Sequence, residues 1–258
     1  MNRTKPILVA AISIAMALTL SCSGDDGGNS SGIDGSSSSG AEVVTEDSQA
    51  YHCGFGNNAC SMAPYTGSGT IKALLREQGC DNESCMEIID VGTVVNGIVN
   101  LQLPSSFSDK YLISAGAPTN EESEDCQTTV NTVQFSPEDV KFISFPEFFL
   151  FTDDEKIYKL FAGYVKFDAS TLTSDMGAVL SIYSTKALKI TGEMKTECES
   201  GITSKQETYN FDSETGWSKM YHHVEVKLNT AESFIINSSN PSVLKYDVKW
   251  LVIDANNQ

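Results

Sequence analysis

The chain has 258 residues and carries a formal net charge of −17 at pH 7. Because nucleic-acid binding requires a basic surface, this charge excludes nucleic acid as an expected partner, and it disfavours peripheral binding to anionic lipid. The length accommodates one large β domain or two small ones.

Residues 1–21 have the pattern of an export signal. Arg3 and Lys5 form a short basic region, and residues 7–20 are uncharged and nearly all apolar. This run is too short for a membrane-spanning helix, which needs about 20 residues, but it fits the apolar region of a signal peptide. Ser21 and Cys22 follow directly, so we expect cleavage at this point.

The Ser21-Cys22 junction resembles the lipobox of bacterial lipoproteins, although Thr19 and Leu20 depart from its usual order. The resemblance implies cleavage before Cys22 and acylation of its thiol, which would anchor the chain to a membrane. Ser23, where Asp would signal retention at the inner membrane, implies the outer membrane, on the cell surface or the periplasmic face. The alternative is an ordinary signal peptide with an incidental cysteine.

Residues 22–50 are predicted to form a flexible tether. They contain eight Ser, six Gly and six acidic residues but no basic residue. Such a composition cannot bury enough apolar surface to offset the entropy of ordering the chain. We therefore place the folded body at residues 51–258, with 51–127 and 128–258 as an alternative subdivision.

The six cysteines after Cys22 are expected to form disulfides, because an even number in an exported chain is typical of a disulfide framework. Near-neighbour pairing favours Cys53–Cys60, Cys80–Cys85 and Cys126–Cys198. The rival interpretation is a zinc site, but the spacing of the first four cysteines is not that of structural zinc.

Strand signals dominate the body along its whole length. Residues 69–79 could form one or two helical turns, but residues 71, 73 and 75 alternate with residues 72, 74 and 76, which favours a strand. Asn96-Gly97 predicts a type I′ turn between two β-branched runs. The side chains of residues 161–167 alternate between two faces, which predicts a strand. Residues 209–228 predict a strand, a turn at 214–216 and a second strand. Residues 243–253 predict a strand with one buried face.

Helix signals are weak. Only Pro137 predicts a short helix, with Ser136 as its cap. Many short strands separated by turn signals favour an all-β fold, and specifically an antiparallel β-sandwich of Ig-like or prealbumin-like type.

A family resemblance rests on the signal, the tether and several segments of the body. Residues 69–75, 89–112, 161–167, 186–198 and 207–226, with Gly216-Trp217 after a turn, resemble uncharacterised bacterial surface lipoproteins that carry an antiparallel β body. The first part also resembles prealbumin-like sandwich modules. The resemblance implies an envelope location but no settled activity.

Catalytic motifs are weak throughout. Residues 54–59 match a dinucleotide fingerprint but lie between two cysteines, and the acid-rich loops 121–125 and 153–155 match no EF-hand pattern. His222 and His223 are adjacent in a predicted strand, so one should face inward and one outward, and they cannot chelate one metal. No cofactor is expected.

Two functions follow as expectations. The first is a non-catalytic lipoprotein that binds a polysaccharide or an envelope protein or has a structural role, with Trp217, Trp250 and Tyr221 as ligand-binding candidates. The second is a surface hydrolase acting on glycans with a carboxylate pair. Asp153, Asp154 and Glu155 are its candidate acids and the weak calcium candidates. Residues 145–151, rich in Phe, are either core or an exposed apolar patch that meets a partner.

Overall fold

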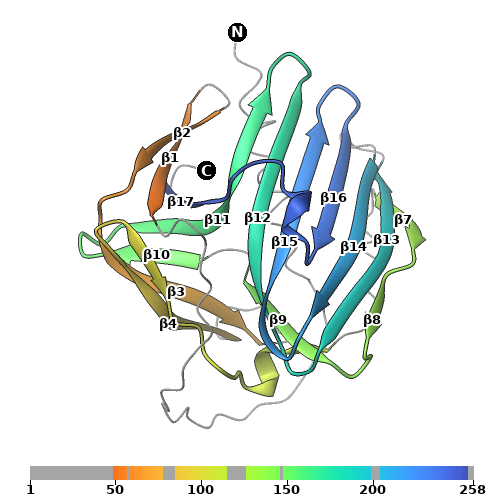
Figure 1. Cartoon of the computed structure of the whole chain (residues 1–258), viewed down its shortest axis with the longest axis horizontal. Helices are drawn as coiled ribbons and strands as arrows, with labels where there is room; N and C mark the ends of the chain where they lie inside the picture. Colours follow the sequence, from red (N-terminus) through yellow and green to blue (C-terminus); the bar gives the residue numbers. More distant parts are fainter. Residues whose placement is uncertain are drawn as a thin grey trace.

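A computed structural model of the chain describes residues 49–56, 59–77, 85–114, 126–145, 148–198 and 204–254. Within these ranges the fold is all-β, as the alternation of polarity predicts (Figure 1). The named helical segments are the 3-10 helices η2 (Asp109–Tyr111) and η3 (Pro241–Val243). None of the helices in the described ranges has the length and hydropathy needed to cross a membrane.

The strands of the first half are short. They are β1 (Ala50–Gly56), β2 (Ala59–Pro64), β3 (Gly69–Arg76), β4 (Met86–Val95), β5 (Ile98–Leu101), β6 (Ile113–Ser114), β7 (Cys126–Asn131), β8 (Gln134–Ser136), β9 (Lys141–Phe145) and β10 (Phe148–Thr152).

The strands of the second half are mostly longer. They are β11 (Ile157–Asp168), β12 (Thr173–Ser184), β13 (Leu188–Cys198), β14 (Ser204–Ser213), β15 (Gly216–Lys227), β16 (Glu232–Ser238) and β17 (Lys249–Asp254).

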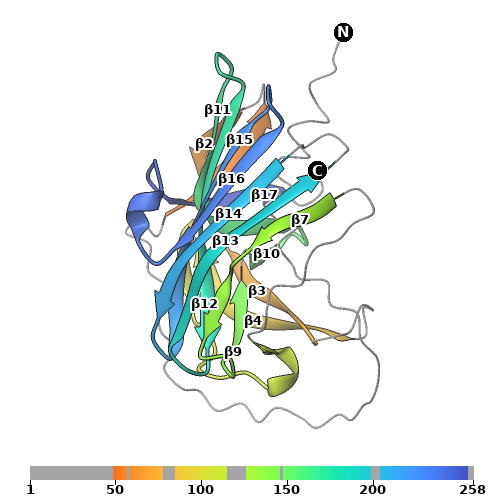
Figure 2. The same cartoon turned by 90° about the vertical axis from the view of Figure 1, so that its right-hand side faces the viewer.

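Strand β11 is the branch point of the sheet. One of its edges pairs with β17, and the other pairs first with β10 and then with β12. From β12 a broad layer continues through β15, β16, β14 and β13, whereas from β10 a smaller part continues through β3, β4 and β5. Figure 2 shows the broad layer edge-on, with β3, β4 and β10 to one side.

The largest core lies between these two parts of the sheet. Val179 on β12 belongs to the same buried cluster as Ile71 on β3 and Leu150 on β10. A second cluster on the opposite face of the broad layer contains Ile190 and Phe211. Because both faces of β12 and β15 contact apolar groups, a polar side chain on either face can be buried.

Several local predictions are confirmed. Residues 69–76 form β3, and Asn96 and Gly97 join β4 to β5 with φ angles of 50° and 80°. Positive φ at both positions is what a type I′ turn requires. Residues 161–167 lie within β11.

The strand–turn–strand prediction for residues 209–228 is confirmed, but the two strands are not neighbours in the sheet. Strand β14 ends at Ser213 and β15 begins at Gly216, which has a φ of 97°. The two strands are joined by a tight turn, yet β16 lies between them, parallel to β14 and antiparallel to β15. A turn signal fixes the connection but not which strand fills the adjacent position.

Two predicted elements are wrong. The strand expected at 243–253 is confined to Lys249–Asp254, because η3 and polar contacts of Lys245 hold the preceding residues outside the sheet. The short helix expected at Pro137 is absent from the described range 126–145. Residues 137–139 instead form a turn after a cis Ser136–Pro137 bond, and the chain then enters β9.

Strand pairing joins the two ends of the body. β1 pairs in parallel with β17, so that Ala50 lies beside Trp250, and β10 pairs with β3. Strands on both sides of residue 127 thus share one network of hydrogen bonds. The predicted signal peptide, Cys22 and nearly all of the tether lie outside the described residues.

Of the cysteines in the body, the structure describes the side chains of Cys53 and Cys85. Cys53 and Cys85 are each disulfide-bonded, and no bond joins two cysteines whose side chains are described. The backbones of Cys126 and Cys198 lie directly opposite each other in β7 and β13. Cys53 lies opposite Met62, while Cys60 lies opposite Phe55. Cys80 lies outside the described residues, so the three proposed pairs remain predictions.

Candidate functional site

The adjacent histidines of β15 lie on opposite faces of the broad layer, and both are buried. His223 lies beside Gly177 of β12, and His222 lies between Ala178 of β12 and Asn237 of β16. The expectation that one histidine faces solvent is therefore wrong, because both faces of β15 are covered. The two rings cannot share a metal ion, as the strand geometry predicts.

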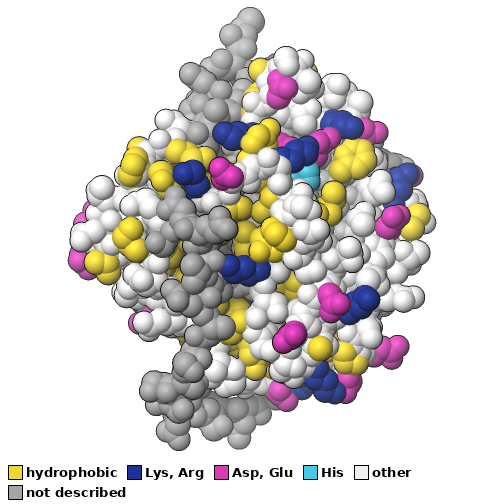
Figure 3. Space-filling view, in the orientation of Figure 1, with side chains coloured by type: hydrophobic (Ala, Val, Ile, Leu, Met, Phe, Trp, Pro, Cys, Tyr) yellow, Lys and Arg dark blue, Asp and Glu magenta, His cyan; other side chains and the backbone are white. Residues whose placement is uncertain are grey.

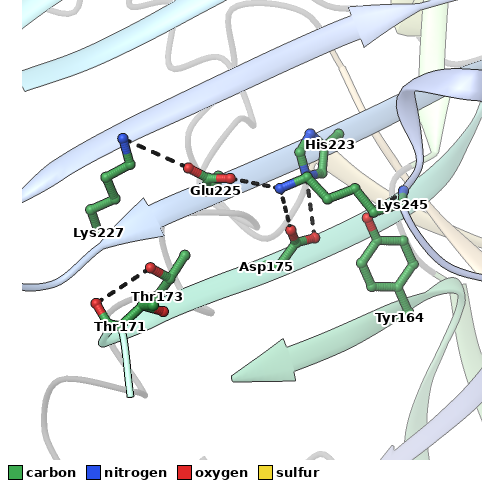
Figure 4. A network of polar contacts seen from close by, with 8 residues as sticks. All are labelled: Tyr164, Thr171, Thr173, Asp175, His223, Glu225, Lys227 and Lys245. Carbon is green, nitrogen blue, oxygen red and sulfur yellow. Dashed lines mark hydrogen bonds and ion pairs between the residues drawn. The ribbon is translucent and has the colours of Figure 1, made fainter. Parts of the chain in front are cut away.

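His223 belongs to a polar cluster centred on Asp175 of β12 (Figure 4). One carboxylate oxygen of Asp175 lies 3.2 Å from Nε2 of His223, and the other lies 2.7 Å from Nζ of Lys245. Glu225, directly opposite Asp175 on β15, lies 2.6 Å from the same ammonium group. The two carboxylates and hydrogen bonds to them raise the pKa of Lys245 above its ordinary value, although desolvation opposes this.

Tyr164 of β11 extends this cluster to the backbone. Its hydroxyl oxygen accepts a hydrogen bond of 3.1 Å from the backbone N–H of Lys245, and its ring meets Tyr246 edge-on. The ring lies over Gly177, where a methyl group would overlap it. Burial raises the pKa of Tyr164 to about 12. The Asp175 cluster thus attaches the segment around Lys245 to the sheet.

A second polar cluster lies on the other face, around Glu207 of β14. Glu207 is 1% exposed, and Nζ of Lys205 lies 2.5 Å from its Oε1. Oε1 therefore has charge compensation, while no hydrogen-bond donor to it is found among the described residues. The hydroxyl of Tyr209 donates to the other oxygen, Oε2.

His222 and Asn237 lie in the next row of the same face. Nδ1 of His222 lies 2.7 Å from Oδ1 of Asn237, so this nitrogen donates and Nε2 is left as an acceptor. Among the described residues, neither Nε2 of His222 nor Nδ2 of Asn237 has a hydrogen-bond partner. Burial lowers the pKa of His222 below its ordinary value of 6.5, and the ring is neutral at pH 7.

This lowered pKa makes a prediction for acid stability. The unfolded chain takes up a proton at His222 near pH 6.5, whereas the folded chain does so only at lower pH, so the free energy of unfolding should fall as pH decreases below 6.5. Chemical denaturation between pH 7 and 5 measures the slope. His222→Asn should flatten it and the exposed His52→Gln should not; equal slopes in all three proteins would contradict the assignment.

Both clusters contain groups used in acid–base catalysis, but their geometry favours a structural role. A nucleophilic mechanism needs a nucleophile within hydrogen-bond reach of the base. In the described contacts His223 meets only a carboxylate, and His222 meets only an amide. Groups of three or more metal-ligating side chains are absent from the described residues.

The predicted aromatic candidates are not on an exposed strip. Trp250 is 2% exposed and packs against Phe148 in the main core. Trp217 is half-buried, packs against Tyr183 and donates from its indole nitrogen to the carbonyl of Pro104 at 2.7 Å. Tyr221 is half-buried against the same core. The three side chains therefore contribute to packing and offer little ring surface for stacking on a sugar.

The acidic candidates of the loop 153–155 are exposed and turned outward. Asp154 forms an ion pair with Lys156 at 2.6 Å and accepts a hydrogen bond from Thr152 at 2.5 Å. The hydrogen bond from Lys156 is the main reason that the pKa of Asp154 is lowered. A general acid of a glycosidase needs a raised pKa, so Asp154 does not fit that role. The other acidic loop, 121–125, lies outside the described residues.

The Phe-rich segment at 145–151 divides between core and surface, because strand alternation turns its side chains to opposite faces. Phe148 and Leu150 are buried, while Phe149 and Phe151 are half-buried on the outer face of β10. On the adjacent strands of this face, Leu74 of β3 and Ile88 of β4 lie directly opposite each other, 38% and 57% exposed. The result is an exposed aliphatic pair that sequence reasoning did not single out.

Charges of both signs are mixed on the face of the molecule that Figure 3 shows. On the face in Figure 3, acidic and basic side chains alternate around small hydrophobic areas, and histidine shows at one point between charged groups. This mixture of charges does not form the single-sign surface that a strongly charged polymer would require.

Three comparisons with known proteins give no likeness: no family model, curated protein or solved structure matches the chain.

Proposed function

We propose that the chain is an outer-membrane lipoprotein, anchored through Cys22, that displays a non-catalytic β-sandwich body for binding a protein partner. The observation that carries the proposal is the junction at residue 50. The acidic Ser/Gly-rich segment predicted to be a tether ends where β1 begins, at Ala50. A lipid-bearing N-terminus, a spacer and a folded body then follow one another without a gap.

The sandwich assignment is part of the proposal and is supported by the position of the main core. Side chains of the broad layer and of the β3–β4–β5–β10 part belong to one buried cluster. Two packed sheets with a shared interior are the defining feature of a sandwich.

A polypeptide is favoured over a polysaccharide as the ligand. Sugar binding by stacking needs exposed aromatic rings, but Trp250 is in the core and Trp217 is half-buried with its indole nitrogen already bonded. The exposed Leu74–Ile88 pair offers instead an aliphatic surface of the kind found in protein interfaces. The hydrolase alternative loses support because its candidate acids at 153–155 are exposed and Asp154 is held in an ion pair with Lys156.

Replacement of Cys22 by Ser tests the anchor. We expect the native chain to incorporate a fatty-acid label in producing cells and to sediment with membranes, whereas Cys22→Ser should lose the label, because the thiol at the cleavage junction is no longer there to be acylated. Cys53→Ser is the matched control, since it removes a cysteine without touching the junction. Equal labelling of the native chain and Cys22→Ser would contradict the proposal.

Protease treatment of intact cells, with permeabilised cells as control, gives the orientation. A flexible segment such as 23–50 should be cut readily if it is outside. Release of the body from intact cells would assign it to the surface, and protection until permeabilisation would assign it to the periplasm.

A further inference from the structure

Strand β4 has one edge that is only half used. Residues 86–94 pair with β3 along one edge, whereas β5 pairs with the other edge only from Gly92 onward. Among the described residues, none pairs with the outer edge of residues 86–90. The edge of a sheet presents a row of N–H and C=O groups that can accept another strand.

The hydrogen-bond pattern shows which groups face outward. The N–H of Glu77 donates to the carbonyl of Cys85 at 3.0 Å, so these residues form a hydrogen-bonded pair. Such pairs alternate along an antiparallel ladder, which directs the backbone groups of Glu87 and Ile89 toward β3. The backbone groups of Met86, Ile88 and Asp90 therefore point away from β3, toward the open edge.

Proline explains why β5 does not continue along this edge. The N–H of Gln102 donates to the carbonyl of Val91 at 2.7 Å, which is the last contact before the open stretch. The next residue that would donate in this ladder is Pro104, which has no N–H. Its carbonyl accepts instead from the indole of Trp217, which directs the chain away.

The open stretch carries two charged side chains, Glu87 and Asp90, but lacks the proline and lysine that often protect an edge strand. Residues 86–90 (MEIID) contain no Pro and no Lys, and the side chain of Ile88 is 57% exposed. Ile88 lies on the outer face beside Leu74, so a strand added here would extend an apolar surface that is already present.

We propose that a second copy of this chain occupies the edge, pairing antiparallel β4 to β4 about a two-fold axis through Ile88. In this register Ile88 lies opposite Ile88 of the other copy, Met86 opposite Asp90, and Glu87 opposite Ile89. The outward N–H and C=O groups of Met86, Ile88 and Asp90 then face those of Asp90, Ile88 and Met86, respectively, in the other copy. A register centred on Glu87 or Asp90 would place two like charges opposite each other, which is destabilising.

The net charge predicts how this pairing responds to salt. The full sequence carries a formal charge of −17, so two copies of the chain repel each other at low ionic strength. Salt screens this repulsion but leaves backbone hydrogen bonds and apolar contacts largely unchanged. The dimer is therefore expected to strengthen as salt is added, whereas a dimer held by ion pairs would weaken.

Single cysteine substitutions in the full chain, expressed in cells, test the two-fold register. In the proposed pair the Cα atoms at position 88 are about 5.5 Å apart, within the disulfide range of about 4.4–6.8 Å. Ile88→Cys should give a band at twice the monomer mass on a non-reducing gel, about tenfold stronger than the Leu172→Cys control. Leu172 is also exposed but lies on a distant turn.

Asp90→Cys is the matched control on the same strand. In the proposed register the two copies of position 90 are offset by four residues, or about 13 Å, and cannot be bridged. Equal cross-linking of Ile88→Cys and Asp90→Cys would overturn the register, and a band no stronger than Leu172→Cys would overturn the dimer. Cross-linking of Ile88→Cys only to a chain of another mass would assign the edge to a different protein and likewise overturn the proposal. The outcome does not depend on whether Cys22 is acylated.

Discussion

Replacement of Lys205 by Met is expected to lower the free energy of unfolding by about 3–5 kcal/mol, because it leaves the charge of a buried carboxylate uncompensated. Glu207 is 1% exposed, and Nζ of Lys205 lies 2.5 Å from its Oε1. The remaining donor to this carboxylate is the hydroxyl of Tyr209. One neutral hydrogen bond does not replace a nearby positive charge inside the protein.

Chemical denaturation of the purified chain measures this loss. Lys195→Met is the matched control, because Lys195 pairs with Glu197 on the neighbouring strand β13 in an exposed ion pair, which contributes at most about 1 kcal/mol. The double variant Lys205→Met/Glu207→Gln should recover most of the stability, since Gln removes the charge and still accepts from Tyr209. A loss in Lys205→Met no larger than in Lys195→Met would show that Glu207 is solvated.

Replacement of Trp250 by Ala is expected to cost about 3–5 kcal/mol of stability, as for other large aromatic side chains removed from a core. Trp250 is 2% exposed, packs against Phe148 and lies in a strand flanked by β1 and β11. The cavity left by the indole cannot close easily, because backbone pairing on both sides fixes the strand.

Tyr246→Ala is the control for Trp250, because Tyr246 is 47% exposed and only four residues away. Its loss should cost less than about 1 kcal/mol, which is typical of surface substitutions. Denaturant midpoints of the two variants decide between core and ligand-binding roles. A ligand-binding Trp250 would be replaceable by Ala without loss of stability.

Local features of the fold could be predicted from the sequence because they are encoded within a few residues. Asn-Gly tolerates positive φ at both turn positions, which is why the β4–β5 connection at Asn96-Gly97 was predictable. The alternation in residues 161–167 likewise identifies a strand with two different faces. These signals need no knowledge of which strands become neighbours.

The candidate sites depend on which strands become neighbours in the sheet, so their burial and contacts could not be predicted from the sequence. His223 is buried beside Asp175, and Asp175 in turn contacts Lys245, although these three residues are distant in sequence. Trp250 was expected on a strand with one wet face, but β17 is flanked by two strands and covered on both faces. For Glu207 the sequence does contain a signal. It lies two and four residues before Tyr209 and Phe211 in the same strand, so its side chain shares their face, and Phe211 is in the core.

The parallel pairing of β1 with β17 has a consequence for the order of assembly. Synthesis delivers β1 first and β17 last, yet Ala50, Tyr51 and His52 find their partners in Trp250, Leu251 and Val252. β1 must remain without this partner until β17 has been synthesised. Such long-range closure is intrinsically slow. Loss of only β17 would therefore open one edge of β1, while the other edge of β1 keeps its pairing with β2.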